Sequence, residues 1–315
     1  MKPLKVVLMG TTDFAVPALV KLQESGFEVA AVVAQPDRPN QRGKKIKYLP
    51  VKAKALALGI PVLQPEKIKT PEMVETLRAI GADVFVVAAY GQLLSEEILF
   101  MPRLGSVNIH GSLLPKYRGA APVHHAIIDG EEESGVTIMK MDVGMDTGDM
   151  LAKAVVPITD ETTVGALHDA LAEAGAELLV DTLKALDAGE LTPEKQDEAL
   201  ATYADKIDKG TGVIDWQATS KSILRRINGT DPFPSASTRC NGEIMKVFKP
   251  SVQTYRGDET PGTVLEADSK KGLVVKTGDG AIEIAELQMP GKKRMASRDY
   301  FKGNAIPVGT LLGNL

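Results

Sequence analysis

The sequence contains a single cysteine, Cys240, and no long apolar run. One cysteine excludes an internal disulfide and is typical of a reducing compartment, so we expect a cytoplasmic location. A membrane-spanning helix needs roughly 20 apolar residues in succession, and we therefore expect no membrane partner. The apolar residues 4–9 follow a charged start but run into polar residues, so they predict a first strand and not a signal peptide.

Three motifs that carry well-known chemistry are also missing. The turn after the first strand reads G-T-T-D-F-A from Gly10 and lacks G-x-G-x-x-G, which argues against hydride transfer from a dinucleotide. Ser112 is not part of a G-x-S-x-G elbow, so a serine nucleophile is not expected. His110, His124 and His125 lack the H-E-x-x-H spacing and have no cysteine nearby, so we predict no metal site.

Basic and acidic residues are unevenly distributed along the chain. The net charge is −4, yet residues 206–315 hold 17 Lys and Arg against 12 Asp and Glu. A second basic stretch covers residues 35–54, where seven basic side chains stand against Asp37 alone. An acidic body with a basic tail and a basic loop favours a polyanionic partner, although such a loop can also be a solvated surface segment.

Apolar runs alternate with helical patterns over the first part of the chain. Residues 4–9, 28–34, 82–89 and 105–110 read as buried strands, with helices between them. This alternation predicts an α/β fold, with a doubly wound and mostly parallel sheet whose polar turns line one edge.

The pattern changes near residue 207 to short β runs separated by turns, with the hairpin signal Asn241-Gly242 among them. Short strands at this spacing predict a small OB-like β-barrel, and other five-stranded barrels fit as well. Residues 190–206 are polar and lack a clear period. We therefore predict a catalytic domain over 1–189, a linker over 190–206 and a second domain over 207–315.

Two polar side chains stand out on the strand at residues 105–110. Asn108 and His110 are two apart, so they share one face of the strand while Ile109 takes the other. A carboxylate from the D-V-G-M-D-T-G-D loop at residues 142–149 could join them. Amide, imidazole and carboxylate together suit the attack of a neutral amine on an acyl group, and a satisfied buried polar pair is the alternative.

The same residues resemble a known family. The segment N-I-H-G-S-L-L-P-K-Y-R-G-A-A-P at residues 108–122 is similar to the signature of folate-dependent formyltransferases, and M-D-V-G-M-D-T-G-D resembles their second active-site loop. Further matches are Q-P-D-R-P, G-V-I-D-W, P-G-T-V-L and G-K-K-R-M. Together they resemble the members that formylate the methionine carried by initiator tRNA, over nearly the whole chain.

The resemblance implies an enzyme that takes the formyl group from 10-formyltetrahydrofolate, with no metal and no obligate protein partner. It implies that Asn108 and His110 stabilise the tetrahedral intermediate and that Asp146 tunes His110 and relays a proton. It assigns folate binding to Ser112, Leu113, Leu114, Pro115, Tyr90, Gly91 and Asp142. It assigns the basic loop, through Arg42, Lys44 and Lys45, to the tRNA.

One departure and three alternatives remain. The family commonly has Ala-Gly before the arginine that matches Arg42, whereas this chain has Asn40-Gln41. The same constellation could serve a formyl-folate hydrolase, a transferase for a sugar-nucleotide or ribonucleotide amine, or a tRNA- or folate-binding protein without activity. A hydrolase would have no use for a basic C-terminal barrel, and an intact set of Asn108, His110 and Asp146 argues against an inactive protein.

Overall fold

The computed structural model describes residues 2–38 and 48–313. The chain forms two compact units and crosses between them several times. The first unit comprises Met1–Gly119, Ser134–Val156 and His168–Tyr203, and the second comprises Ala120–Glu133, Pro157–Leu167 and Ala204–Leu315. The domain limits expected from the sequence, at 189 and 207, stay a prediction.

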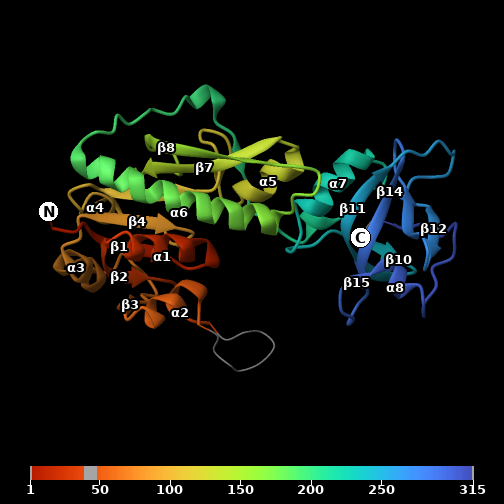
Figure 1. Cartoon of the computed structure of the whole chain (residues 1–315), viewed down its shortest axis with the longest axis horizontal. Coiled ribbons are helices and arrows are strands. Elements are labelled where there is room, and N and C mark those ends of the chain that lie inside the picture. Colours follow the sequence, from red (N-terminus) through yellow and green to blue (C-terminus); the bar gives the residue numbers. More distant parts are fainter. Residues whose placement is uncertain (1, 39–47, 314–315) are drawn as a thin grey trace. The chain divides into compact units, whose positions relative to one another are not determined.

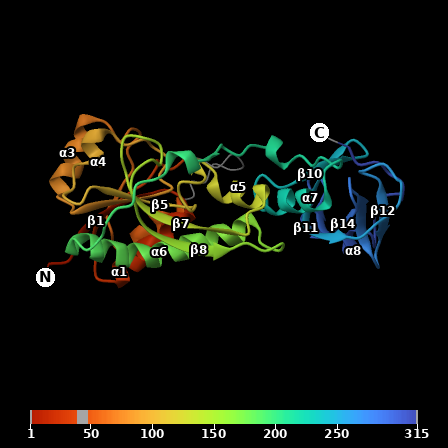
Figure 2. The same ribbon diagram turned by 90° about the horizontal axis from the view of Figure 1, so that it is seen from above.

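The first unit is built on a seven-stranded sheet with strand order β3-β2-β1-β4-β5-β7-β8 (Figures 1 and 2). Its strands are β1 Lys5–Gly10, β2 Glu28–Val33, β3 Val62–Leu63, β4 Val84–Ala88, β5 Ser106–His110, β7 Glu133–Lys140 and β8 Met150–Pro157. The pairs from β3 to β5 are parallel, and β5 pairs with β7 in antiparallel fashion. This confirms the doubly wound, mostly parallel sheet.

Helices cover the sheet because its strands are apolar on both faces. All five residues of β4 are buried, as a parallel strand between two helical layers requires. The helices outside the second unit's barrel are α1 Val16–Glu24, α2 Pro50–Ala57, α3 Pro71–Ile80, α4 Glu96–Leu99 and α6 Val164–Ala188. Within the described ranges, none of the helices is both long enough and apolar enough to cross a membrane.

Strand β5 lies inside the sheet and carries the polar pair. Val87 of β4 pairs with Asn108, and Thr137 of β7 pairs with His110. On the opposite face, Ile109 packs against α6, where a Cβ built on Gly175 would lie 2.7 Å from Ile109 Cγ2. Helix α6 therefore covers the apolar face of β5, and Asn108 and His110 lie on the other face.

The second unit contains a curled antiparallel sheet with strand order β10-β11-β14-β13-β12, and β15 pairs with β14. Its elements are α5 Pro122–Asp129, α7 Ser220–Asn228, β10 Ser237–Cys240, β11 Glu243–Gln253, β12 Val264–Asp268, β13 Gly272–Lys276, β14 Ala281–Gln288, β15 Met295–Ala296 and α8 Ser297–Tyr300. The remaining short strands are β6 Arg118–Gly119 and β9 Tyr203–Ala204. The predicted small barrel-like domain is confirmed.

The C-terminal segment joins both edges of this sheet. Leu311 forms a bridge to Thr263, which precedes edge strand β12, and Gly313 forms a bridge to Arg239 of edge strand β10. Pairing both edges with one segment satisfies backbone groups that could otherwise pair with other chains.

The P-G-T-V-L motif needs its glycine. Gly262 has a φ of +95°, and a Cβ there would lie 2.7 Å from the Leu312 carbonyl oxygen.

Replacing Gly175 by valine tests the close packing of α6 on β5. The added side chain would meet Ile109 Cγ2 and Val136 Cγ2, and overpacking of this kind costs about 1–3 kcal/mol. We expect Gly175→Val to lower the free energy of unfolding by that amount in urea denaturation. The matched control is Asp181→Val at an exposed position of the same helix, which should change stability by less than about 0.5 kcal/mol. Equal stability of the two variants would contradict this packing.

Candidate active site

The imidazole of His110 is held at the end of β5 by a backbone carbonyl. The residue is 5% exposed, and its Nε2 lies 2.9 Å from the carbonyl oxygen of Tyr117. A carbonyl oxygen only accepts hydrogen bonds, so Nε2 carries a hydrogen and donates it. Nδ1 is therefore the ring nitrogen left to exchange a proton or to contact a ligand.

Asp146 faces this free nitrogen. Its Oδ2 lies 3.7 Å from His110 Nδ1 and accepts a 2.8 Å hydrogen bond from the backbone N–H of Gly119. The loop that carries Asp146 begins after Lys140, the last residue of β7. Lys140 pairs with Val107, so the loop begins beside the start of β5. The loop then returns along β5 to His110, and Asp146 takes a left-handed conformation with a φ of +54°.

Asn108 completes the polar face of β5. The residue is half-buried, and within residues 2–38 and 48–313 its amide makes no hydrogen bond. Two residues along a strand span about 7 Å, so its amide and the His110 ring can contact the same small group. The structure thus brings together the three side chains predicted to be catalytic, and their roles stay a prediction.

The segment predicted to bind folate is folded tightly onto the sheet. Thr137 Oγ1 donates to the Ser112 carbonyl oxygen at 2.7 Å and accepts from the Leu114 N–H at 3.1 Å. Ser112 is fully buried and its hydroxyl donates to the Lys116 carbonyl oxygen, and Leu114 is 1% exposed. Leu113 and Pro115 are partly exposed, so they are the members of this segment that a ligand could reach.

The other predicted folate residues occupy different surroundings. Tyr90 is 2% exposed in an apolar cluster, and burial raises the pKa of its phenol to about 12. Gly91 is exposed with a φ of +88°. Asp142 Oδ1 accepts from the Gly144 N–H and the Thr147 hydroxyl and so closes the turn of its own loop. The Tyr90 ring therefore supports the core, and Gly91 is the exposed member of this pair.

The residues assigned to the tRNA lie outside the described residues. Arg42, Lys44 and Lys45 belong to the segment 39–47, as do Asn40 and Gln41. Their assignment to the tRNA stays a prediction. Among the residues that the structure does describe, no group of three or more His, Cys, Asp and Glu side chains could hold a metal ion.

Sequence reasoning missed a set of residues that contact the loops of the site. Arg118 is fully buried and binds Gln196 and Glu198, and Thr202 binds the backbone of Tyr117. Gln196 and Glu198 belong to the aperiodic segment 190–206, which the sequence predicts to be a linker. The one signal in the sequence is the arginine of K-Y-R-G, a charged side chain within the signature segment.

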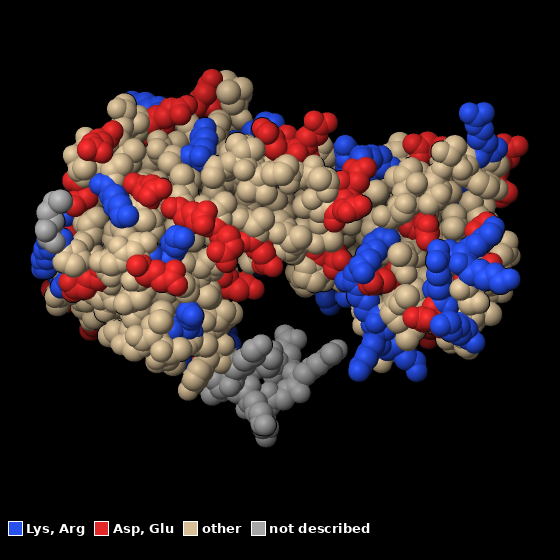
Figure 3. All heavy atoms as spheres, in the orientation of Figure 1, with Lys and Arg blue, Asp and Glu red and all other residues tan. Residues whose placement is uncertain are grey.

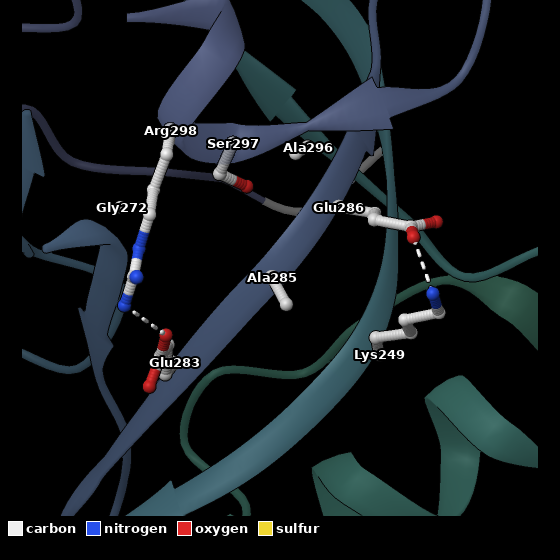
Figure 4. A pocket seen from close by; sticks show the side chains of 8 residues that line it. All are labelled: Lys249, Gly272, Glu283, Ala285, Glu286, Ala296, Ser297 and Arg298. Carbon is white, nitrogen blue, oxygen red and sulfur yellow. Dashed lines mark ion pairs between the residues drawn. The ribbon is translucent and has the colours of Figure 1, made fainter. Parts of the chain in front are cut away.

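A hollow in the second unit has a different character (Figure 4). Its volume is about 320 Å³, and its basic side chains are paired with acidic ones. Lys249 Nζ lies 2.5 Å from Glu286 Oε1 and lowers the pKa of that carboxyl, and Arg298 lies 3.7 Å from Glu283. Because these cations already have partners, the hollow is not arranged as an anion site.

The comparisons with known proteins cover both parts of the chain. Residues 4–183 match the family described as formyl transferase, and residues 206–305 match the family described as formyl transferase, C-terminal domain. This chain belongs to the formyltransferase family. The predicted enzyme class is confirmed, and the residues around Asn108, His110 and Asp146 lie within the first match.

Two relatives of this formyltransferase match it from end to end. A methionyl-tRNA formyltransferase of Caldanaerobacter subterraneus subsp. tengcongensis is 48% identical over 98% of this chain and 100% of its own. One from Ruminiclostridium cellulolyticum is also 48% identical, with the same coverage. A solved N-formyltransferase of Helicobacter canadensis, in complex with folinic acid and dTDP-3-aminofucose, is 20% identical with a TM-score of 0.66, over 91% of this chain and 99% of that one. At that identity the structure supports the fold alone.

Replacing Asp146 by asparagine tests the His110–Asp146 pair. An asparagine oxygen can still accept from the Gly119 N–H, so the loop should keep its shape while the charge beside His110 Nδ1 is lost. We expect kcat for formyl transfer to fall about 10²–10⁴-fold, with the KM for the formyl donor nearly unchanged. The matched control is Asp149→Asn in the same loop, which should retain activity. An unchanged kcat in Asp146→Asn would remove this carboxylate from the chemistry.

Proposed function

We propose that this formyltransferase transfers the formyl group of 10-formyltetrahydrofolate to the α-amino group of the methionine carried by initiator tRNA, in support of translation initiation. The observation that carries the proposal is the His110–Asp146 pair beside the Asn108 amide, which has no hydrogen-bond partner among the residues that the structure describes. The site lies in a chain that matches methionyl-tRNA formyltransferases over 98% of its length. Protein synthesis places the enzyme in the cytoplasm, in agreement with its one buried cysteine.

The proposed reaction begins with attack of the neutral α-amine on the formyl carbon. A new C–N bond forms, and the carbonyl oxygen becomes an oxyanion that the Asn108 amide N–H can stabilise. His110 Nε2 is already committed to the Tyr117 carbonyl. Donation from Nδ1 to the oxyanion as well requires a hydrogen on both ring nitrogens.

Asp146 completes the proton balance. The attacking amine must lose a proton, and the carboxylate beside His110 Nδ1 can accept it directly or through a water molecule. Collapse of the tetrahedral intermediate breaks the bond to N10 of the folate, and the proton is returned to that leaving nitrogen. Formyl-methionine and tetrahydrofolate are the products, with no covalent intermediate on the enzyme.

The planar ring of the formyl donor needs a binding surface beside Asn108, His110 and Asp146. The loop of Asp146 exposes two apolar side chains, Val143 at 75% and Met145 at 62%. Apolar side chains with a few polar groups among them are the usual lining of a cofactor site. Leu113 and Pro115, which are partly exposed, and Gly91, which is exposed, are other predicted contacts that remain accessible.

The basic regions fit the tRNA. Figure 3 shows Lys and Arg side chains gathered on the visible face of the second unit, on the right, whereas Asp and Glu are frequent on the visible face of the first. Phosphates attract such a surface by a long-range and salt-dependent force. The loop with Arg42, Lys44 and Lys45 adds a second basic region in the sequence, and we assign it to the acceptor end of the tRNA.

The product of the reaction decides between this function and its rivals. The purified protein is incubated with 10-formyltetrahydrofolate and either methionyl initiator tRNA or a sugar-nucleotide amine. We expect formyl-methionine from the tRNA and no formylated sugar. Release of formate at the same rate with and without an acceptor would identify a hydrolase, and formylation of the sugar alone would identify a transferase of the other class.

Two exposed lysines test the contact between the second unit and the tRNA. Lys292 and Lys293 belong to the G-K-K-R-M motif and make no ion pair within the described residues, whereas Lys271 is paired with Glu266. Each lysine that contacts a phosphate should contribute about 0.7–0.9 to the slope of log K against log salt. We expect Lys292→Gln and Lys293→Gln to reduce tRNA affinity and this slope, and Lys271→Gln to change them little. Equal slopes in all three variants would contradict the contact.

A further inference from the structure

Arg118 is a charged side chain inside the first unit. It is 0% exposed, and its guanidinium binds Glu198 in a bidentate fashion, with Nη1 at 2.9 Å from Oε2 and Nη2 at 2.7 Å from Oε1. Its Nε and Nη2 also donate to Gln196 Oε1, at 3.0 and 2.8 Å. A guanidinium is always charged, so its burial demands acceptors of this kind.

The side chain of Gln196 has only one possible orientation. Its Oε1 accepts from Arg118, which only donates, and its Nε2 donates to the carbonyl oxygens of Asp146 and Gly148, which only accept. The two Nε2 bonds measure 2.7 and 2.8 Å. Both hydrogens and the oxygen of the amide are therefore used, and Gln196 joins Arg118 to the loop of Asp146.

These contacts lie at the two points where the His110–Asp146 pair is held. Tyr117, directly before Arg118, supplies the carbonyl that binds His110, and Gly119, directly after it, supplies the N–H that binds Asp146. The Tyr117 N–H donates to Thr202 Oγ1, and the Arg118 N–H donates to the Thr202 carbonyl oxygen. We call residues 196–202 the strap, because they cross both loops of the site.

We propose that Gln196 is a positioning residue for catalysis, which sets the place of the Asp146 carboxylate relative to His110 by holding the Asp146 carbonyl. The proposal rests on the proposed role of Asp146. Asp146 has a φ of +54°, a conformation that a residue other than glycine keeps only when its surroundings impose it. Without the Gln196 amide, the loop loses the two donors that bind its backbone at Asp146 and Gly148.

The experiment uses variants of Gln196, since replacement of the buried Arg118 could prevent folding. Gln196→Met has similar length but no polar group, and Gln196→Glu keeps an oxygen toward Arg118 while it loses the donors to the loop. We expect both to lower kcat about 10–100-fold, in line with the cost of a misplacement of about 1 Å at a reacting group. The KM for the formyl donor should change less than kcat, since Gln196 binds the loop at Asp146 and Gly148 and not at the residues assigned to the donor.

A matched control separates positioning from simple loss of stability. Arg103 ties two parts of the same unit through Asp83 and Asp187, with N–O distances of 2.7 Å in both pairs. Arg103→Gln should lower the melting temperature by an amount similar to Gln196→Met and leave kcat within about twofold. If the two variants lower kcat equally at equal melting temperature, Gln196 serves stability and the proposal is overturned.

A double-mutant cycle shows whether Gln196 acts through Asp146. The rate of formyl transfer in a single turnover is measured for the unaltered protein, Gln196→Met, Asp146→Asn and the double variant. We expect the effect of Gln196→Met to shrink to about twofold or less in the Asp146→Asn background, as residues that act as one unit are not additive.

The cycle keeps the two hypotheses distinct. If Asp146→Asn reduces the rate and Gln196→Met has the same effect in both backgrounds, the role of Asp146 stands and the positioning role of Gln196 is overturned. If Asp146→Asn leaves the rate unchanged, the role of Asp146 itself fails, whatever Gln196→Met does.

Discussion

The hydrogen bond between His110 Nε2 and the carbonyl oxygen of Tyr117 is the interaction on which the site depends. Because a carbonyl can only accept, it determines which ring nitrogen carries a hydrogen and which one faces Asp146. Two residues later, the Gly119 N–H binds the Asp146 carboxylate. One segment of three residues thus orients the imidazole and the carboxylate through its backbone.

The side chain in the middle of that segment explains why the segment keeps its place. Arg118 is buried with Glu198 and Gln196, and Gln196 in turn holds the loop of Asp146. A buried guanidinium without these acceptors would be strongly unfavourable, so the contacts with the strap and the shape of the loop depend on each other. The alignment of catalytic groups is in this way linked to a segment with no reacting atom of its own.

Much of the scaffold and part of the site could be predicted from the sequence. Alternation along residues 105–110 indicated that Asn108 and His110 share a face, and the close approach of Gly175 to Ile109 supports this. The strap could not be predicted. Its residues form short irregular elements that follow neither a period of 2 nor one of 3.6. Their partners are far away in the chain, since Gln196 comes 78 positions after Arg118.

The sequence by itself determined the parallel sheet, the barrel-like second unit and the family, because apolar periodicity, turn residues and signature motifs are properties of short segments. Only the tertiary structure decided the distance between Asp146 and His110 and which ring nitrogen faces the carboxylate. It also decided that Ser112 and Leu114 are buried, while the Asn108 amide has no partner in the described part of the chain. These features depend on hydrogen bonds between groups that are distant in sequence. Such bonds form only after the sheet has packed and water has been excluded.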